Sequence, residues 1–237
     1  RSKKTLLEDF IARPAVSPGK QAAVRLLRSR HASVDAFNQA WGAQLKSWDE
    51  LAALESLPMT NDAAKAAQRE FLRDYARAYF KTCRDAIKAA DPNHLLLGCR
   101  FAGYAPPEVV EAMGEFVDVV SYNNYSFAAP VDPLRKLQAA TGKPVMLTEF
   151  SFKAKDSGLP NTKGAGQAIA TQQDRADHFD RYVTALAQLP PAGQRVPLGI
   201  TATEHFPAMQ LPTRHGSKPN AQSLAPLHCT RDGCRQW

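Results

Sequence analysis

A carboxylate that directly follows a short apolar run is the first residue of this chain with the position and chemistry for catalysis. Glu149 lies between Thr148 and Phe150, after an apolar run from Pro144 to Leu147. Such a run predicts a buried β-strand. In a (β/α) barrel the active site lies at the carboxyl ends of the strands, so a Glu at that end is a catalytic candidate. The alternative is a structural ion pair between Glu149 and a nearby Arg or Lys.

Two earlier segments repeat the pattern of an apolar run that ends in polar side chains. The run from Leu95 to Leu97 is followed by Arg100, and the β-branched run that begins at Val117 leads to Asn123, Asn124 and Tyr125. The carboxyl ends of neighbouring parallel strands meet at one edge of a sheet. We therefore expect these side chains to gather near Glu149.

Helical patterns alternate with these strands. Apolar and aromatic residues recur at helical spacing between 74 and 90, and Pro107 suits the first turn of a short helix at 106–113. Further helices are predicted at 133–140, which ends at Thr141-Gly142, and at 172–189; a last strand is predicted at 196–201. Alternating strands and helices, with strands that are apolar on both faces, predict a parallel α/β sheet.

Three strand motifs together resemble a known family. They are Asp91-Pro-Asn-His-Leu-Leu-Leu-Gly-Cys-Arg, Val117-Asp-Val-Val-Ser-Tyr-Asn-Asn-Tyr and Lys143-Pro-Val-Met-Leu-Thr-Glu-Phe. In this order they resemble strands five, six and seven of the retaining glycoside hydrolases of clan A, in particular the β-agarase and β-galactosidase group. The resemblance covers roughly residues 40 to 200. It implies that Glu149 is the nucleophile, since the family's nucleophile is the Glu that ends strand seven.

The resemblance also implies a set of substrate-binding residues around Glu149. Arg100, Asn123, Asn124 and Tyr125 fall where such enzymes line the sugar site, and Arg100 would keep Glu149 ionised through charge and hydrogen bonding. Near the end of the last strand lie two more candidates, Glu204 and His205, for which a surface pair without a role is the alternative.

The departures from the family are equally specific. The family's second carboxylate, the acid/base, belongs to an Asn-Glu pair at the end of strand four, and no Asn-Glu pair occurs in this sequence. Residues 1–70 resemble the excursion that follows strand four, so we expect the chain to begin after the acid/base. That carboxylate would be missing, or would come from Glu204 or another chain. The Trp that the family carries near the end of strand eight has no counterpart in Gly199-Ile-Thr-Ala-Thr-Glu-His-Phe.

The expected fold is therefore α/β, a partial (half) TIM-type (β/α) barrel with about four parallel strands and an N-terminal helical region. Its parts are an N-terminal helical excursion at 1–70, the half barrel at 71–206 and an irregular C-terminal tail at 207–237. A half barrel cannot close on itself. The inner faces of the strands, with Leu95–Leu97, Val117–Val120 and Val145–Leu147, would meet water, which predicts a homo-oligomer.

Composition narrows the classes of partner. The sequence carries a net charge of +7, but its Lys and Arg residues are scattered and no zinc finger or helix-turn-helix pattern is present, so we expect no nucleic-acid partner. No run of 18 apolar residues or signal peptide is visible, so we expect no membrane association, and the cytoplasm and secretion both remain open.

The cysteines and remaining motifs indicate neither cofactor nor metal. Cys83 and Cys99 fit buried free thiols, whereas Cys229 and Cys234 have a spacing that fits a small disulfide loop, two metal ligands or thiols without a role. A Gly-rich loop at 156–166 fits a mobile loop over the site better than a phosphate cradle. Trp41 and Trp48 fit core packing better than sugar stacking.

Three functions follow from these residues. The first is a retaining glycoside hydrolase that acts on β-linked oligosaccharides, polysaccharides or aryl glycosides. The second is an inactive or carbohydrate-binding fragment of a barrel glycosidase that keeps part of the sugar site. The third, a basic nucleic-acid-binding domain, has the least support.

Overall fold

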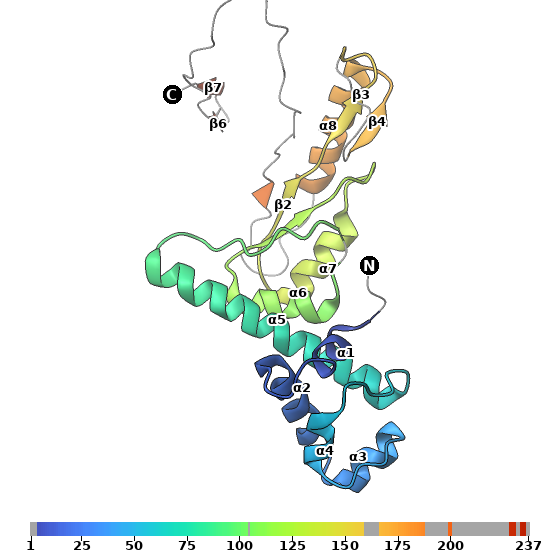
Figure 1. Ribbon diagram of the computed structural model, residues 1–237. Coiled ribbons are helices and arrows are strands. Elements are labelled where there is room, and N and C mark those ends of the chain that lie inside the picture. The colour runs from blue at the N-terminus through green and yellow to red at the C-terminus, as the bar shows by residue number, and fades with distance from the viewer. Residues whose placement is uncertain are drawn as a thin grey trace, which may run out of the picture. The chain divides into compact units, whose positions relative to one another are not determined.

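The N-terminal region is a group of short helices, three of which begin with a side-chain cap. The computed structural model describes residues 4–103, 105–158 and 166–187, and the backbone of short strands at 199–200, 228–230 and 233–235. The first helices are α1 (Leu6–Ile11), α2 (Pro18–Ser29), α3 (Val34–Trp41) and α4 (Trp48–Ala53) (Figure 1). Thr5, Ser33 and Ser47 accept hydrogen bonds from the exposed backbone N–H groups of α1, α3 and α4.

These helices enclose a hydrophobic core of their own. Its largest buried members are Phe37 and Trp41, whose rings stack at a centroid distance of 5.3 Å. The indole N–H of Trp41 donates to Nε2 of His31 at 3.1 Å, so its polar atom is satisfied inside the core. Trp48 packs edge-on against Phe37. The core role predicted for both tryptophans is confirmed.

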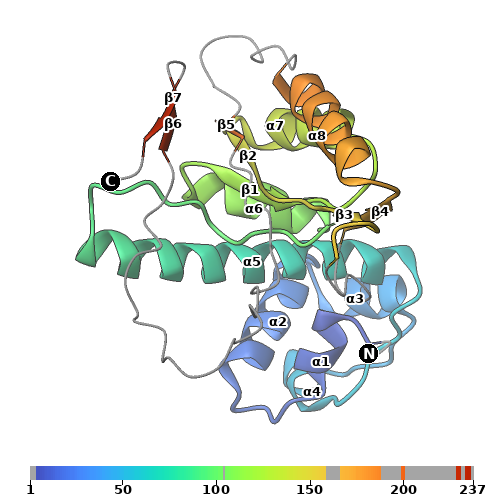
Figure 2. The same ribbon diagram turned by 90° about the horizontal axis from the view of Figure 1, so that it is seen from above.

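A single long helix, α5 (Asp62–Ala90), belongs to two cores. Phe71, in its first half, packs with the N-terminal helices, whereas Ala76 and Phe80 pack with the sheet region. Figure 2 shows α5 running between the two groups of elements. Helical periodicity predicted residues 74–90, and the helix starts earlier because Asn61 caps it by accepting from the Ala64 N–H at 2.8 Å.

The next elements form a small parallel sheet with helices packed on it. They are α6 (Pro107–Phe116), β1 (Val120–Asn123), α7 (Val131–Thr141), β2 (Val145–Glu149) and, further on, β5 (Gly199–Ile200). The described strands pair in parallel in the order β1-β2-β5. The predicted alternation of helices and parallel strands is confirmed in these elements.

The expected strand before α6 is present only as an extended edge segment. Within it, Phe101 alone forms a parallel bridge, with Tyr122 of β1. Two backbone bonds, from the Phe101 N–H to the Ser121 carbonyl and from the Asn123 N–H to the Phe101 carbonyl, hold it there. Gly98, at a φ of 65°, interrupts regular strand geometry just before this point.

Strand β1 departs from the prediction of strands that are apolar on both faces, whereas the first three residues of β2, Val145–Leu147, agree with it. Side chains alternate along β1, where Val120 and Tyr122 face one way and Ser121 and Asn123 the other. Ser121 is fully buried and donates from Oγ to the Leu97 carbonyl at 2.9 Å.

The apolar residues that we expected to meet water are also mostly covered. Val117, Val119 and Val120 are buried, as are Val145 and Leu147, whereas Leu95 and Leu97 are exposed. The uncovered part of the sheet therefore lies at its edge segment rather than across all its strands.

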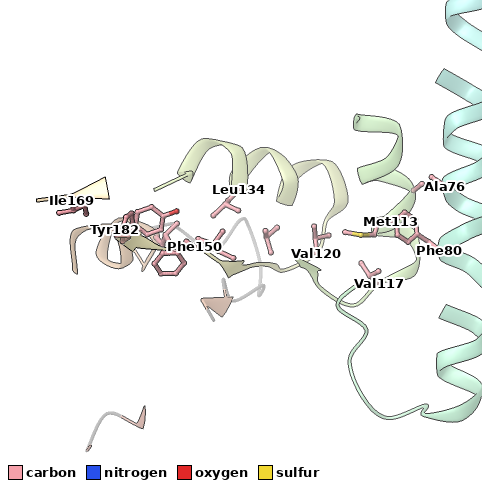
Figure 3. Packing of buried hydrophobic residues seen from close by; sticks show 14 residues of the cluster. Ala76, Phe80, Met113, Val117, Val120, Leu134, Phe150, Ile169 and Tyr182 are labelled. Carbon is pink, nitrogen blue, oxygen red and sulfur yellow. The ribbon is translucent and has the colours of Figure 1, made fainter. Parts of the chain in front are cut away.

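After β2 the chain makes a second, shorter parallel pair and a helix. These are β3 (Phe152–Ala154), β4 (Gln167–Ile169) and α8 (Gln172–Ala187). Figure 3 shows how buried side chains continue from Phe80 of α5, through Met113 and Val120, to Phe150, Tyr182 and Ile169. This second core carries β1 and β2, whose carboxyl ends bear the polar candidates.

The C-terminal region forms a separate unit, Phe206–Trp237. Its described residues are β6 (His228–Thr230) and β7 (Gly233–Arg235), an antiparallel pair in which Cys229 stands opposite Cys234 in the backbone register. Within the described ranges, no helix is long and apolar enough to cross a membrane.

Candidate active site

An irregularity in the pairing of β1 and β2 places two polar side chains opposite one another. The register runs from Val120 opposite Val145 to Tyr122 opposite Leu147, then shifts so that Asn123 stands opposite Glu149. On β2 the shift falls at Thr148, between Leu147 and Glu149. The backbone bond from the Asn124 N–H to the Glu149 carbonyl, at 2.9 Å, continues the pairing beyond it. Such irregularities commonly re-aim side chains at functional positions.

The Glu149 carboxylate accepts two hydrogen bonds on the same oxygen. Oε2 receives one from Nη1 of Arg100 at 3.0 Å and one from Nδ2 of Asn123 at 2.8 Å. The Glu149 side chain is 17% exposed, whereas that of Arg100 is 59% exposed. The arrangement therefore holds Oε2 through two donors, neither of which contacts Oε1.

The orientation of the Asn123 amide follows from its two neighbours. Its Oδ1 accepts from the Thr148 hydroxyl at 2.8 Å, and its Nδ2 points at the Glu149 carboxylate. An ionised carboxylate only accepts hydrogen bonds, so the NH₂ group must face Glu149. Asn123 is 7% exposed. Thr148, which we did not predict as a site residue, is therefore what fixes the amide that contacts Glu149.

Arg100 reaches Glu149 from the edge segment. The bridge between Phe101 and Tyr122 fixes the backbone one residue after Arg100, beside β1. The predicted gathering of Arg100 and Asn123 around Glu149 is what the geometry shows. The ion pair proposed as an alternative is present as well, so Glu149 has both a charged and a neutral donor.

The other two predicted residues of this stretch, Asn124 and Tyr125, lie in the loop that follows β1. Oδ1 of Asn124 accepts from the backbone N–H of Ser126 at 3.0 Å and from its hydroxyl, and lies 3.5 Å from the Tyr182 hydroxyl. The Tyr125 carbonyl accepts from Nε2 of Gln167 at 2.8 Å. The Asn124 amide is thus engaged within the protein, and the Tyr125 side chain is half-buried.

Helix α8 supports the same loop through residues that the sequence pattern did not single out. His178, 7% exposed, contacts the Phe127 carbonyl through Nε2 at 2.7 Å. Burial raises the pKa of the Tyr182 hydroxyl, and the charge of Tyr122 is a smaller cause of the same shift. His178 and Tyr182 are four residues apart and both lie on the buried face of α8. Nothing in the sequence indicated which loop that face would hold.

Some predicted features lie outside the described residues. Glu204 and His205 do, as does most of the loop at 156–166. Cys83 and Cys99 are free thiols and are half-buried rather than fully buried. Sγ of Cys99 lies 3.8 Å from the Tyr79 hydroxyl, and this interaction raises the pKa of Tyr79 to about 12. Among the residues that the structure describes, no group of three or more potential metal ligands gathers.

Comparisons with known proteins identify relatives of one kind. No family model matches the chain. The β-agarase A of Vibrio sp. (strain JT0107) is 40% identical over 171 residues, 68% of this chain, and the β-agarase B of the same strain is 32% identical over 176 residues, 73% of this chain. The predicted resemblance to β-agarases is confirmed at this level.

Solved structures give the same result. The crystal structure of an agarase matches 83% of this chain with a TM-score of 0.73 and 32% identity. The structure of an exo-β-agarase matches 81% of it with a TM-score of 0.70 and 33% identity. The chain covers 17% and 18% of the lengths of the two Vibrio β-agarases, and 27% and 25% of the two solved chains. It is thus similar to one portion of much longer agarases.

Proposed function

We propose that this chain forms part of a β-agarase-like glycoside hydrolase that cleaves a β-linked galactan by a retaining mechanism. The observation that carries the proposal is Glu149, at the end of a parallel strand, with one carboxylate oxygen held by Arg100 and Asn123. The similarity to agarases supports agarose or its oligosaccharides as the substrate class.

The contacts divide the work between the two oxygens of Glu149. In a retaining glycosidase one carboxylate attacks the anomeric carbon and forms a covalent glycosyl-enzyme, which water then hydrolyses. Oε2 is held by two donors, so Oε1 is the attacking oxygen. Arg100 pairs with the carboxylate as an ion pair, and Asn123 fixes the direction of attack. Thr148 positions Asn123.

The remainder of the site follows from the same proposal. We place the chain's parallel sheet in the second half of a clan A (β/α)₈ barrel, as a half barrel whose edge segment is strand five. The acid/base carboxylate is then supplied by Glu204 or by protein outside the described residues. The exposed Leu95 and Leu97 at the sheet edge support association with further protein, a second copy of this chain among the options. Light scattering at micromolar concentration tests that copy, and a stable monomer would contradict it.

A covalent labelling experiment tests the role of Glu149 without needing the acid/base. A 2-deoxy-2-fluoro-β-galactosyl fluoride carries a leaving group that departs as fluoride ion, so no proton donor is required. Attack by Oε1 forms an ester at the anomeric carbon and breaks the C–F bond there. Intact-mass spectrometry should show one added fluorosugar, and peptide mapping should place it on Glu149.

Two variants make the result specific. Glu149→Gln should abolish labelling, because a neutral amide is a poor nucleophile. Glu115→Gln, which removes a different Arg-paired carboxylate, that of Glu115 with Arg77, should leave it unchanged. Labelling at another carboxylate, or equal labelling of Glu149→Gln, would overturn the assignment.

A second function is favoured by one feature of the sequence. The Asn-Glu pair that carries the family's acid/base is absent from the sequence. A chain that binds the sugar but does not turn it over would show agaro-oligosaccharide binding by calorimetry with no fluorosugar adduct. That combination of results would favour a carbohydrate-binding module over an enzyme.

A further inference from the structure

We infer that Phe127 forms a sugar-binding platform beside Glu149, on which the apolar face of a galactose-type ring stacks. This inference rests on the proposed function and names a ligand contact for the same site. Phe127 is 55% exposed, in the loop between β1 and α7 that begins at Asn124. It was not among the residues predicted to contact substrate.

The position of Phe127 follows from the pairing of its loop with β2. The Asn124 N–H donates to the Glu149 carbonyl at 2.9 Å, so the start of the loop is fixed at the candidate nucleophile. Phe127 is three residues further on, and three residues reach at most about 11 Å. One or two linked sugar rings span such a distance. Phe127 therefore lies within reach of a ring bound next to the one that Glu149 attacks.

One side of the Phe127 ring is fixed by the protein. The centroids of the Phe127 and His178 rings lie 4.1 Å apart. The centroid of the His178 ring in turn lies 4.4 Å from that of Phe152. His178 is itself buried and holds the Phe127 carbonyl through Nε2. The Phe127 ring therefore packs against a buried imidazole that is itself held by the core.

The loop that carries Phe127 is braced on both sides of it. The Ser126 hydroxyl bonds to Oδ1 of Asn124 and to the Ala128 carbonyl, and Gln167 holds the Tyr125 carbonyl. A ring on a loop already ordered loses little conformational freedom when a ligand binds.

The shape of the platform selects the chemistry of its ligand. A flat aromatic ring has a weakly negative face and attracts C–H groups and cations. A galactose-type ring presents several C–H bonds on one face, because its 4-hydroxyl is axial and points away from that face. A neutral galactan is therefore the ligand that this surface suits.

Calorimetry with agaro-oligosaccharides of increasing length tests the platform. Phe127→Ala should weaken binding by about tenfold for those long enough to reach it, as should Phe127→Leu, which keeps apolar bulk without a flat ring. Phe127→Trp should preserve or tighten binding. Tyr75→Ala, which removes a comparably exposed aromatic side chain from α5, should have no effect.

The outcomes separate this inference from the proposed function. Equal affinity of wild type and Phe127→Ala, with fluorosugar labelling of Glu149 intact, would overturn the platform and leave the glycosidase assignment in place. Failure of wild type both to bind the oligosaccharides and to be labelled would overturn both. Saturation-transfer NMR adds a readout of contact, since Phe127→Ala should remove saturation from the C–H face of one ring.

Discussion

The N-terminal helices and the parallel sheet differ in how completely they cover their large apolar side chains. Of the large hydrophobic side chains that are exposed among the described residues, Val16 alone lies in the helical region, whereas the others lie from Tyr75 onward, on α5, the edge segment and the β1–α7 loop. The helices α1, α3 and α4 begin with side-chain caps, whereas α6 and α7 begin at Pro106 and Pro130 without them.

The difference indicates which region depends on its surroundings. The helical core is closed by its own residues, and three of its short helices, α1, α3 and α4, have a side-chain cap, whereas α2 has none. The sheet region closes one core but leaves Leu95 and Leu97 exposed on the edge segment that leads to Arg100. The large apolar side chains without full cover therefore lie mainly in the sheet region rather than in the helical core.

The largest expected effect is the loss of Trp41 from the helical core. Trp41→Ala removes a 1%-exposed ring and should lower the free energy of unfolding by about 3–5 kcal/mol. Leu95→Ala, at a 69%-exposed position, should change it by less than about 0.5 kcal/mol. Urea denaturation followed by circular dichroism measures both. Similar losses of unfolding free energy in the two variants would contradict the difference in burial between the helical core and the edge segment.

Two glycines with the same backbone conformation compare the regions directly. Gly42 and Gly98 have φ values of 67° and 65°, so an Ala at either is strained by about 1–2 kcal/mol. A Cβ at Gly98 would also approach Val117 Cγ1 at 2.8 Å and Met113 Sδ at 2.9 Å, whereas one at Gly42 meets nothing within 4 Å.

Gly98→Ala should therefore destabilise the protein by about 1–3 kcal/mol more than Gly42→Ala does. Thermal unfolding of the two variants under one condition gives the comparison. Equal costs would mean that the edge segment is not packed tightly on α6.

The cap of α5 gives a smaller effect. Asn61→Ala leaves the Ala64 N–H without its partner and should cost about 1 kcal/mol. Asn61→Asp keeps an accepting oxygen at the helix N-terminus and should cost much less, which makes it the matched control. Chemical denaturation distinguishes them, and equal losses would show that the cap does not stabilise the helix.

The smallest effect concerns the attachment of the edge segment to β1 and its dependence on pH. The Leu96 N–H donates to Oδ2 of Asp118 at 2.7 Å, and this bond, with Lys88 as a further cause, lowers the pKa of Asp118. A lowered pKa in the folded state means that the carboxylate stabilises the attachment fully above its unfolded pKa of about 3.9.

That stabilisation is lost as pH falls through the lower folded pKa. The Leu96 amide resonance should shift toward its unbonded position only at the acid end of an NMR titration. It should already be shifted at neutral pH in Asp118→Ala. An amide that titrates near neutral pH, or one indifferent to Asp118→Ala, would contradict this attachment.

Much of the sheet region was predictable because its signals are local. An apolar run followed by Glu149, and another followed by Asn123, each identify a strand and its end from adjacent residues. The parallel arrangement then follows from the helices between them, because strands joined by helical crossovers run the same way.

The remainder depended on contacts between residues far apart in the sequence. The register shift that sets Asn123 opposite Glu149 is invisible in either strand alone, and so is the bond by which Thr148 orients the amide. His178 is about 50 positions from the loop that it supports. Both faces of β1 were predicted to be apolar, but Ser121 is polar and lies on one of them. Its burial is possible because its hydroxyl donates to the Leu97 carbonyl, a contact that the local sequence does not show.

The 29-residue helix α5 has a consequence for how the protein unfolds. At about 1.5 Å per residue it is roughly 44 Å long, and a polar helix of this kind is only marginally stable without packing. One half is secured by Phe71 and the other by Phe80. Melting of either core would therefore release a long stretch of the backbone on which the other rests. We therefore expect the two cores to unfold together, and amide exchange at the middle of α5 should be as slow as global unfolding.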